Sequence, residues 1–426
     1  MVMPPEQIDQ PSGVYRMANT KAEFQRYYQV ILVALLSVNF GVLFLDRNAL
    51  GFLIDFVKKD IELDNAQIGL LSSAIAFSWA ISGFAIGRWS DALRRRKSIL
   101  IVATVAFSLC SVASSLAGSF AVLLATRLLM GLAEGGVLPV SQALVMSSVA
   151  PDRRGLAMGV MQNAGSQLIG GFLAPIVLTA VAISFGWRNA FFLAGIPGLI
   201  CAALMLWLVR EPRQTAIADS DAESRLSTWQ ALRQRNIWVC AIMAVLMVSM
   251  FLICLTFMKL FLVDVRKFET TLAATLLGVL GLSSVAGSFV IPGLSDRFGR
   301  RPLMILTPLL GVVLPLAAMY WNGSPIVLGL LLVIGWMPLG CFPLLMATIP
   351  SEAVGSRNLA TALGLVMGLG EILGGVLGPY GAGLAADAGG LSMPLWIMLA
   401  LCVCTSGLGF LLKESAPRLV SGLSHS

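Results

Sequence analysis

The segment GRWSDALRRRK at residues 87–97 lies between two long apolar stretches, and a variant of it, GLSDRFGRR, lies at residues 293–301. The acid of the first segment, Asp91, matches Asp296 in the second, and basic residues follow both. Two matching charged segments in one chain indicate an internal repeat.

A second pair of segments supports this repeat. RRGLAMGVMQNAGSQLIGGFLAP at residues 153–175 aligns with RNLATALGLVMGLGEILGGVLGP at residues 357–379. Pro175 then falls on Pro379, and Gln167 falls on Glu371. The chain therefore contains two related halves in the same order.

The composition is that of a chain embedded in a membrane. Of the 426 residues, 57% are apolar and only 12% are charged, and the mean hydropathy is +0.86, which lies outside the range of soluble domains. An apolar run of about 20 residues crosses a hydrocarbon core of about 30 Å. Twelve such runs lie near residues 28–53, 66–88, 98–118, 120–148, 155–184, 189–209, 236–264, 271–293, 302–321, 325–350, 358–386 and 391–412.

The repeat and the runs together predict an all-α polytopic membrane protein with twelve transmembrane helices in two parallel six-helix repeats. Any substrate site is then expected between the halves at mid-depth. The predicted parts are an N-terminal segment (1–27), an N-terminal six-helix bundle (28–210), a linker (211–235), a C-terminal six-helix bundle (236–413) and a tail (414–426).

Basic residues fix the expected orientation, because short cytoplasmic loops are rich in Lys and Arg. Most of the 29 Lys and Arg fall in alternate loops, among them 88–97, 210–235 and 296–301, on the side of both termini. We therefore expect both termini and the linker to be cytoplasmic, in what we take to be a bacterial inner membrane. This asymmetry accounts for the net charge of +7, so no nucleic-acid partner is inferred.

The twelve-helix plan with its repeated charged loop resembles the major facilitator superfamily of secondary transporters over nearly the whole chain. The first loop departs from the family pattern at Ala92 and Arg94, where Arg and Gly are common, and Pro292 takes the first Gly position of the second loop. The resemblance implies alternating access and a cytoplasmic gate in which acids pair with neighbouring Arg residues. The gating residues expected from it are Asp91, Arg95, Asp296 and Arg300.

Charged residues deep within the spans are the strongest functional signal, because a charge at the centre of a spanning helix costs roughly 2.5–3.5 kcal/mol even on insertion scales. Arg127 and Glu134, in TRLLMGLAEGG, lie nearly two turns apart on one face of their helix, roughly 10 Å along the axis. Asp46 and Arg47 are adjacent in the first span and point in different directions, so their partners are expected on other helices. The full set is Asp46, Arg47, Arg127, Glu134, Lys259 and Glu371.

Arg residues at mid-depth imply an anionic substrate, because guanidinium stays charged and binds a carboxylate with two parallel hydrogen bonds. A carboxyl group among apolar neighbours can load and release a proton, so Asp46 and Glu134, together with Glu371, are the expected proton-coupling groups. The alternative is a buried network of Asp46, Arg47, Arg127 and Glu134 that only fixes helix packing.

Within the superfamily, Asp46-Arg47 in the first span and Arg127 to Glu134 in the fourth resemble the anion:cation symporters, which carry organic and sugar acids. That resemblance implies carboxylate binding by the first-span Arg and proton coupling by the acids. Spinster-type lipid transporters share Asp-Arg and part of the second pattern, so they remain an alternative.

Other residues complete the predicted site. Phe44 precedes Arg47 by one turn and Trp79 lies in the middle of the second span, so both can line a cavity or face lipid. Gln162 and Gln167 are polar at membrane depth and can bind substrate. Lys259, near the outer end of its span, is expected to reach the interface.

We therefore expect a monomeric secondary transporter that imports a small organic anion with protons. A proton-driven exporter of an amphipathic acid, drug or lysolipid is the first alternative, and a non-transporting membrane sensor is the second. No enzyme is expected, since the one histidine, His425, lies in the tail, and neither a cofactor nor a metal site is predicted.

Overall fold

The computed structural model describes residues 12–93, 95–149, 154–211, 234–354 and 359–416 of the chain, and these residues form helices without any strand. The linker 212–233 and the chain ends 1–11 and 417–426 lie outside the described residues. The predicted all-α class is therefore confirmed. Eleven described helices are long and apolar enough to span a membrane, and a twelfth, Met393–Gly409, is shorter.

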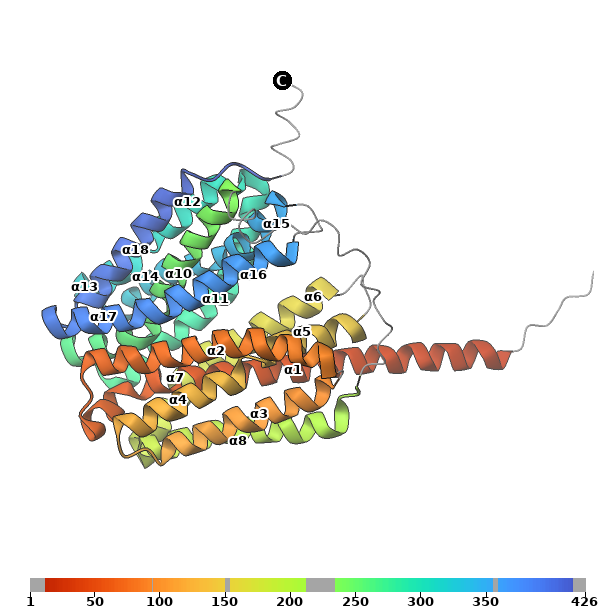
Figure 1. The fold of residues 1–426 in the computed structure, drawn as a ribbon. Coiled ribbons are helices and arrows are strands. Elements are labelled where there is room, and N and C mark those ends of the chain that lie inside the picture. The colour runs from red at the N-terminus through yellow and green to blue at the C-terminus, as the bar shows by residue number, and fades with distance from the viewer. Residues whose placement is uncertain (1–11, 94, 150–153, 212–233, 355–358, 417–426) are drawn as a thin grey trace, which may run out of the picture.

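The described part of the first half contains six spans, drawn from red to yellow-green in Figure 1. They consist of α1 (Ser12–Ile61), α2 (Asn65–Leu93), α3 (Arg96–Ser115), α4 (Phe120–Glu134) with α5 (Val137–Ser148), the series α6 (Arg154–Gly159), η2 (Val160–Ala164), η3 (Ser166–Leu173) and α7 (Ala174–Phe185), and α8 (Trp187–Leu208).

The second half, drawn from green to blue, repeats this arrangement. It consists of α10 (Arg235–Leu260) with η4 (Phe261–Val265), α11 (Thr270–Phe298), α12 (Arg300–Leu310) with α13 (Val313–Tyr320), the series α14 (Pro325–Trp336), η5 (Met337–Cys341), η6 (Leu344–Thr348) and α15 (Ile349–Ala353), the series α16 (Leu359–Leu369), η8 (Gly370–Gly374) and α17 (Gly375–Gly389), and α18 (Met393–Gly409).

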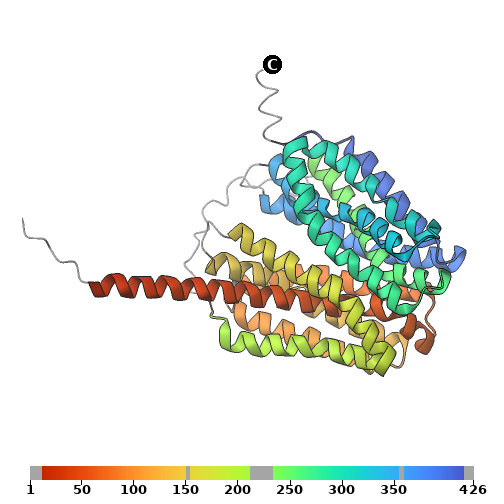
Figure 2. The ribbon, with the colours of Figure 1, turned by 180° about the vertical axis from the view of Figure 1, so that it is seen from behind.

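The first helix is longer than its apolar run. Hydropathy predicts a span over residues 28–53, whereas α1 runs from Ser12 to Ile61. Its added N-terminal residues include Ala, Glu, Lys, Arg and Gln, which favour helix without requiring burial. Figures 1 and 2 show this part of α1 projecting beyond the other helices.

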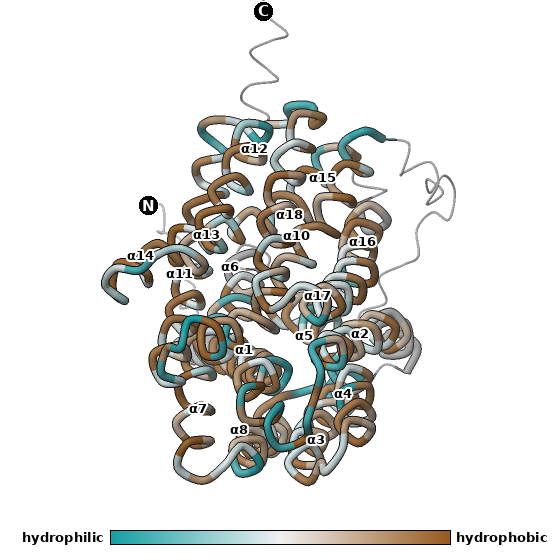
Figure 3. Tube along the Cα trace, turned by 90° about the vertical axis from the view of Figure 1, so that its left-hand side faces the viewer, coloured by the Kyte–Doolittle hydropathy of each residue, from teal (hydrophilic) through white to brown (hydrophobic). Residues whose placement is uncertain are grey.

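The halves pack through a small set of helices. α17 lies along α2, α1 packs against α10, and α11 packs against η3 and α7. The helix α10 is central, because 72% of the most apolar window of its span, Arg235–Val265, is buried, against 33–56% in the other ten spans. Figure 3 shows that apolar residues cover most of the helices, as a lipid environment requires.

Candidate functional site

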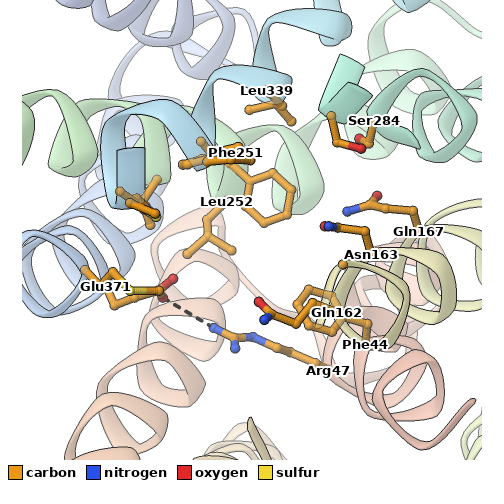
Figure 4. Close-up of a pocket in the computed structure, with 18 of the residues that line it drawn as sticks. Phe44, Arg47, Gln162, Asn163, Gln167, Phe251, Leu252, Ser284, Leu339 and Glu371 are labelled. Atoms are coloured by element: carbon orange, nitrogen blue, oxygen red, sulfur yellow. Dashed lines mark ion pairs between the residues drawn. The ribbon is translucent and has the colours of Figure 1, made fainter. Parts of the chain in front are cut away.

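A cavity of about 380 Å³ lies between the two halves. Its lining on the N-terminal half comes from α1, α6, η2 and η3. On the C-terminal half it comes from α10, α11, η5, η6, the two residues between η5 and η6, α16 and η8. Figure 4 shows Arg47 and Glu371 facing each other across one end of it. The lining residues are Phe44, Arg47, Asn48, Met158, Gly159, Gln162, Asn163, Gln167, Val248, Phe251, Leu252, Ser284, Ser288, Leu339, Phe342, Pro343, Met346, Ala347, Met367 and Glu371.

Arg47, on α1, is the basic residue in the lining of the cavity. Its Nη2 lies 3.8 Å from Glu371 Oε2, which is too long for a good hydrogen bond. On the other side its guanidinium carbon lies 4.9 Å from the centroid of the Trp79 ring, a cation–π distance. Arg47 is therefore oriented by an acid of one half and a ring of the other, and its guanidinium is only loosely paired.

Close backbone approach brings α1 to the cavity wall. A Cβ atom at Gly41 would lie 2.6 Å from the Gly165 carbonyl oxygen, so α1 can cross the η2–η3 region here only without a side chain. Ser37 Oγ donates to the Val160 carbonyl at 3.0 Å and accepts from Gly165 N–H at 3.1 Å. Hydrogen bonds thus fix the η2–η3 region of the cavity wall to α1. This region is π-helical, and π-helical turns are frequent at functional sites.

One π-helical stretch recurs in the two repeats, because η3 and η8 occupy equivalent positions, whereas η2 matches a stretch of the α-helix α16. η2 and η3 fall in the first repeated segment, 153–175, and η8 falls in the second, 357–379. Gln162 and Gln167 lie in the first pair, and Glu371 lies in η8. The extra residue in each π turn shifts the facing of polar side chains, and all three reach the cavity.

Two of the predicted substrate contacts lie elsewhere. Arg127 and Trp79 are absent from the lining of the large cavity. Arg127 instead shares with Arg47 a small cavity of about 30 Å³, which is large enough for a water molecule. In this conformation, therefore, a molecule in the large cavity meets Arg47 and not Arg127.

Asp46, Arg127 and Glu134 form a buried group behind Arg47. Arg127 Nη2 donates to Ser114 Oγ at 2.6 Å, and Arg127 acts electrostatically on both acids. Both carboxylates are fully buried, and Glu134 has no hydrogen-bond partner among the described residues. Ionised carboxylates in that situation are strongly penalised.

The second predicted gating pair is close in space. Arg300 Nη1 lies 2.5 Å from Asp296 Oδ1, and Arg300 Nη2 lies 3.0 Å from Glu352 Oε1. Ser415 Oγ donates to the other Glu352 oxygen at 2.6 Å. Glu352 was not among the predicted residues; it is an acid that faces the loop cation Arg300 from another helix, α15.

The first gating pair is described only in part. The side chain of Asp91 lies outside the described residues. Arg95 is exposed and precedes α3, where its carbonyl accepts from Ile99 N–H at 3.1 Å.

The expectation for Lys259 was wrong. Lys259 is fully buried, and its Nζ lies 2.9 Å from Asp55 Oδ1 and 3.1 Å from Thr179 Oγ1, while also donating to the Phe52 carbonyl. Asp55 was missed because the predicted first span ended at residue 53, before the end of α1. A buried partner removes the reason for the lysine to reach the interface.

A model of the Major Facilitator Superfamily matches residues 36–370 and 271–424. The hexuronate transporter of Bacillus subtilis (strain 168) is 31% identical over 61% of this chain and 64% of its own length, so just under two thirds of that relative is compared. The probable 4-methylmuconolactone transporter of Cupriavidus pinatubonensis is 26% identical over 77% of each chain. The multidrug resistance protein MdtL of Escherichia coli O81 is 27% identical over 82% of each chain.

Solved structures share the fold. A bacterial homologue of the human lysosomal transporter Spinster, inward-facing and unoccupied, superposes with a TM-score of 0.77 at 20% identity, over 90% of this chain and 96% of that chain. The Escherichia coli xylose transporter XylE, inward open, gives a TM-score of 0.72 at 13% identity, over 92% of this chain and 98% of that one. Because the family model spans most of a chain folded as a membrane-spanning helical array, this protein is an integral, multi-pass member of the Major Facilitator Superfamily.

Proposed function

We propose that the protein is a secondary transporter that imports a small organic acid together with protons by alternating access. The observation that carries the proposal is the place of Arg47, a loosely paired guanidinium on the wall of a cavity between the halves. Guanidinium binds carboxylate through two parallel hydrogen bonds, so an organic anion is the ligand that this cavity favours.

The acids around Arg47 supply the proposed proton coupling. Glu371 competes with the substrate for Arg47, because both offer a carboxylate to the same guanidinium. Asp46 and Glu134 are fully buried behind it, where the neutral form of a carboxylic acid is the cheaper one. A proton taken from outside and released inside would then accompany each substrate molecule.

The proposed cycle follows from these contacts. Protonation of Glu371 releases Arg47, the freed guanidinium binds the substrate carboxylate, and the neutralised site lets the two halves rock about it. Deprotonation of Asp46 or Glu134 on the cytoplasmic side resets the charges. The Asp296–Arg300 pair, with Asp91 and Arg95 in the first repeat, is proposed to hold the cytoplasmic gate.

The placement in the cell is also a proposal. The basic loops lie on the side of both termini, which supports cytoplasmic ends in a bacterial inner membrane. We propose a monomer, with the six-helix bundles 28–210 and 236–413 as its moving parts. The relatives named as hexuronate and 4-methylmuconolactone transporters support an organic acid as cargo.

Export is the competing function, and the similarity to a multidrug resistance protein favours it. The two are separated by uptake of labelled carboxylates into proteoliposomes, with and without an inward proton gradient. Uphill uptake of one acid that stops when the gradient is collapsed supports import with protons. Expulsion of a compound from acid-loaded vesicles, with no gradient-driven uptake, would instead assign the protein as an exporter.

A further inference from the structure

The two walls of the cavity differ in chemistry, and the geometry points to a ring-bearing monocarboxylate as the substrate. Its single carboxylate binds Arg47, a flat apolar ring lies against the C-terminal half, and its polar substituents are confined to the edge that faces the N-terminal half. This inference rests on the proposed function, since it takes the same cavity as the transport site.

The wall from the C-terminal half carries an aromatic platform. The Phe251 ring stacks on Trp336 with centroids 5.7 Å apart and planes inclined by 28°, and meets the Phe342 ring edge-on at 6.2 Å and 85°. Phe251 and Phe342 line the cavity, beside Leu252 and Leu339. Two rings fixed at nearly a right angle form an apolar corner that matches a flat ring, because aromatic pairs prefer stacked and edge-to-face contact.

The hydroxyl groups of this wall already have partners. Ser284 Oγ donates to the Leu280 carbonyl at 3.2 Å and accepts from Trp336 Nε1 at 2.9 Å. Ser288 Oγ donates to the Val285 carbonyl at 2.8 Å. No hydroxyl proton on this wall is therefore free to donate to a substrate within the described part of the chain. A substrate with several hydroxyls would find only the remaining lone pairs of two serines there and would leave most of its hydroxyls without a partner.

The wall from the N-terminal half is polar, in contrast to the apolar wall from the C-terminal half. Four amide side chains line it, and none of them hydrogen-bonds to another side chain or to the backbone within the described ranges. Each side-chain amide offers an NH₂ group that donates hydrogen bonds and a carbonyl oxygen that accepts them. Hydroxyl or carbonyl substituents on one edge of a ring can be satisfied there by Asn48, Gln162, Asn163 and Gln167.

Charge and size narrow the class further. Among the described residues Arg47 is the one cation that lines the cavity, and the facing charge is the acid Glu371, so a second carboxylate would lie beside an acid or an apolar wall. The volume of about 380 Å³ is near the lower end of the roughly 300–1,000 Å³ typical of ligand sites. A single-ring monocarboxylate fits these limits, whereas a dicarboxylate and a lysolipid do not. A sugar acid meets the limits of charge and size but is disfavoured by its hydroxyls, which the C-terminal wall cannot all pair.

The test is isothermal titration of the purified full-length protein with four probes: 4-hydroxybenzoate, its uncharged analogue 4-hydroxybenzamide, the polyol acid glucuronate and the dicarboxylate phthalate. We expect 4-hydroxybenzoate to bind at least about tenfold more tightly than glucuronate or phthalate, because unmatched polar groups strongly disfavour binding. The benzamide should bind no better than glucuronate.

A pair of variants tests the platform itself. Phe251→Leu removes the ring while keeping an apolar side chain, and should weaken 4-hydroxybenzoate about two- to tenfold. Phe289→Leu is the matched control, because Phe289 lies on the same half, is 73% exposed and lies outside the cavity lining. It should leave binding unchanged.

The outcomes separate this inference from the proposed function. Tighter binding of glucuronate or phthalate, equal loss in both Phe variants, or no binding of any ring acid would overturn the substrate class. Gradient-driven uptake of glucuronate would keep proton-coupled import and discard the ring acid. Binding of 4-hydroxybenzoate without gradient-driven uptake would keep the ring acid and discard coupled import.

Discussion

Lys259 Nζ lies 2.9 Å from Asp55 Oδ1 with both side chains buried, and the pair joins α10 of one half to α1 of the other. Asp55 lies seven residues beyond Asn48 of the cavity lining, which is roughly 10 Å along the helix axis. The ion pair therefore connects the halves on the side of the cavity away from the Asp296–Arg300 cluster.

This pair predicts a non-additive response to mutation. Lys259→Met or Asp55→Asn alone removes one partner of a buried pair, which typically costs about 3–5 kcal/mol, and each should lower the Tm of the detergent-solubilised protein. The double variant should recover part of the loss, because no uncompensated charge remains. Lys59→Met, at an exposed position of α1, serves as the control; losses that simply add in the double variant would show that the two residues act independently.

Arg47 should depend on its shape as well as on its charge. Arg47→Lys keeps a cation but loses the planar fork, and charge-assisted hydrogen bonds contribute about 1.5–3 kcal/mol. We expect substrate affinity to fall at least about tenfold in Arg47→Lys, and Arg47→Ala to abolish binding. Titration of the transported acid measures both effects, and an unchanged Kd in Arg47→Lys would rule out two-point carboxylate recognition.

Glu134→Gln should separate substrate exchange from proton-driven accumulation. Glu134 is fully buried and has no hydrogen-bond partner among the described residues. An amide of the same shape therefore replaces the carboxyl group without breaking a hydrogen bond. Counterflow of labelled substrate should persist, while uphill uptake driven by a proton gradient should disappear. Glu269→Gln, an exposed acid-to-amide change, should do neither; gradient-driven uptake retained in Glu134→Gln would remove that acid from the coupling scheme.

Glu414 predicts a pH dependence of stability. Burial by itself raises the pKa of this carboxyl, but backbone N–H groups of Ala416, Arg300, Arg301 and Ser415 donate to it and together hold its pKa below the usual value. A lowered folded-state pKa means that the stabilisation is present above the ordinary Glu value and is lost as pH falls through the folded pKa.

The comparison that checks this is Tm against pH for the wild type and Glu414→Gln. The wild-type advantage should be full near neutral pH and shrink under acid conditions. A constant difference between the two curves would show that the carboxylate charge is not what stabilises the site.

The sequence could identify part of the cavity from the cost of polar groups in a membrane. Arg47, Gln162, Gln167 and Glu371 stand out in apolar helices and all four line the cavity. Phe44 also lies there, found from its spacing to Arg47. Polar residues at depth are informative because few reasons can keep them there.

The apolar half of the cavity could not be found in this way. Phe251 and Phe342 are indistinguishable in sequence from the many Phe residues that pack or face lipid, and only the relative rotation of the helices selects them. Asp55 could not be predicted as a buried residue for a different reason. Hydropathy measures the apolar run, whereas α1 continues past that run because helix propensity and the contact with α10 extend it.

The close approach of the halves where α1 meets α10 and where α2 meets α17 has a consequence for the balance between conformations. A Cβ atom at Gly51 would lie 2.5 Å from the Leu255 carbonyl oxygen, and one at Gly69 would collide with the Pro379 carbonyl. The methyl group of an alanine at either position therefore clashes only in the conformation in which α1 touches α10 and α2 touches α17. It raises the free energy of that conformation alone. Each 1.4 kcal/mol of such a penalty changes the ratio of the two forms about tenfold. Gly51→Ala and Gly69→Ala should therefore populate a conformation in which the two halves are separated at these contacts. Labelling of a cysteine introduced at the separated contact would report that conformation.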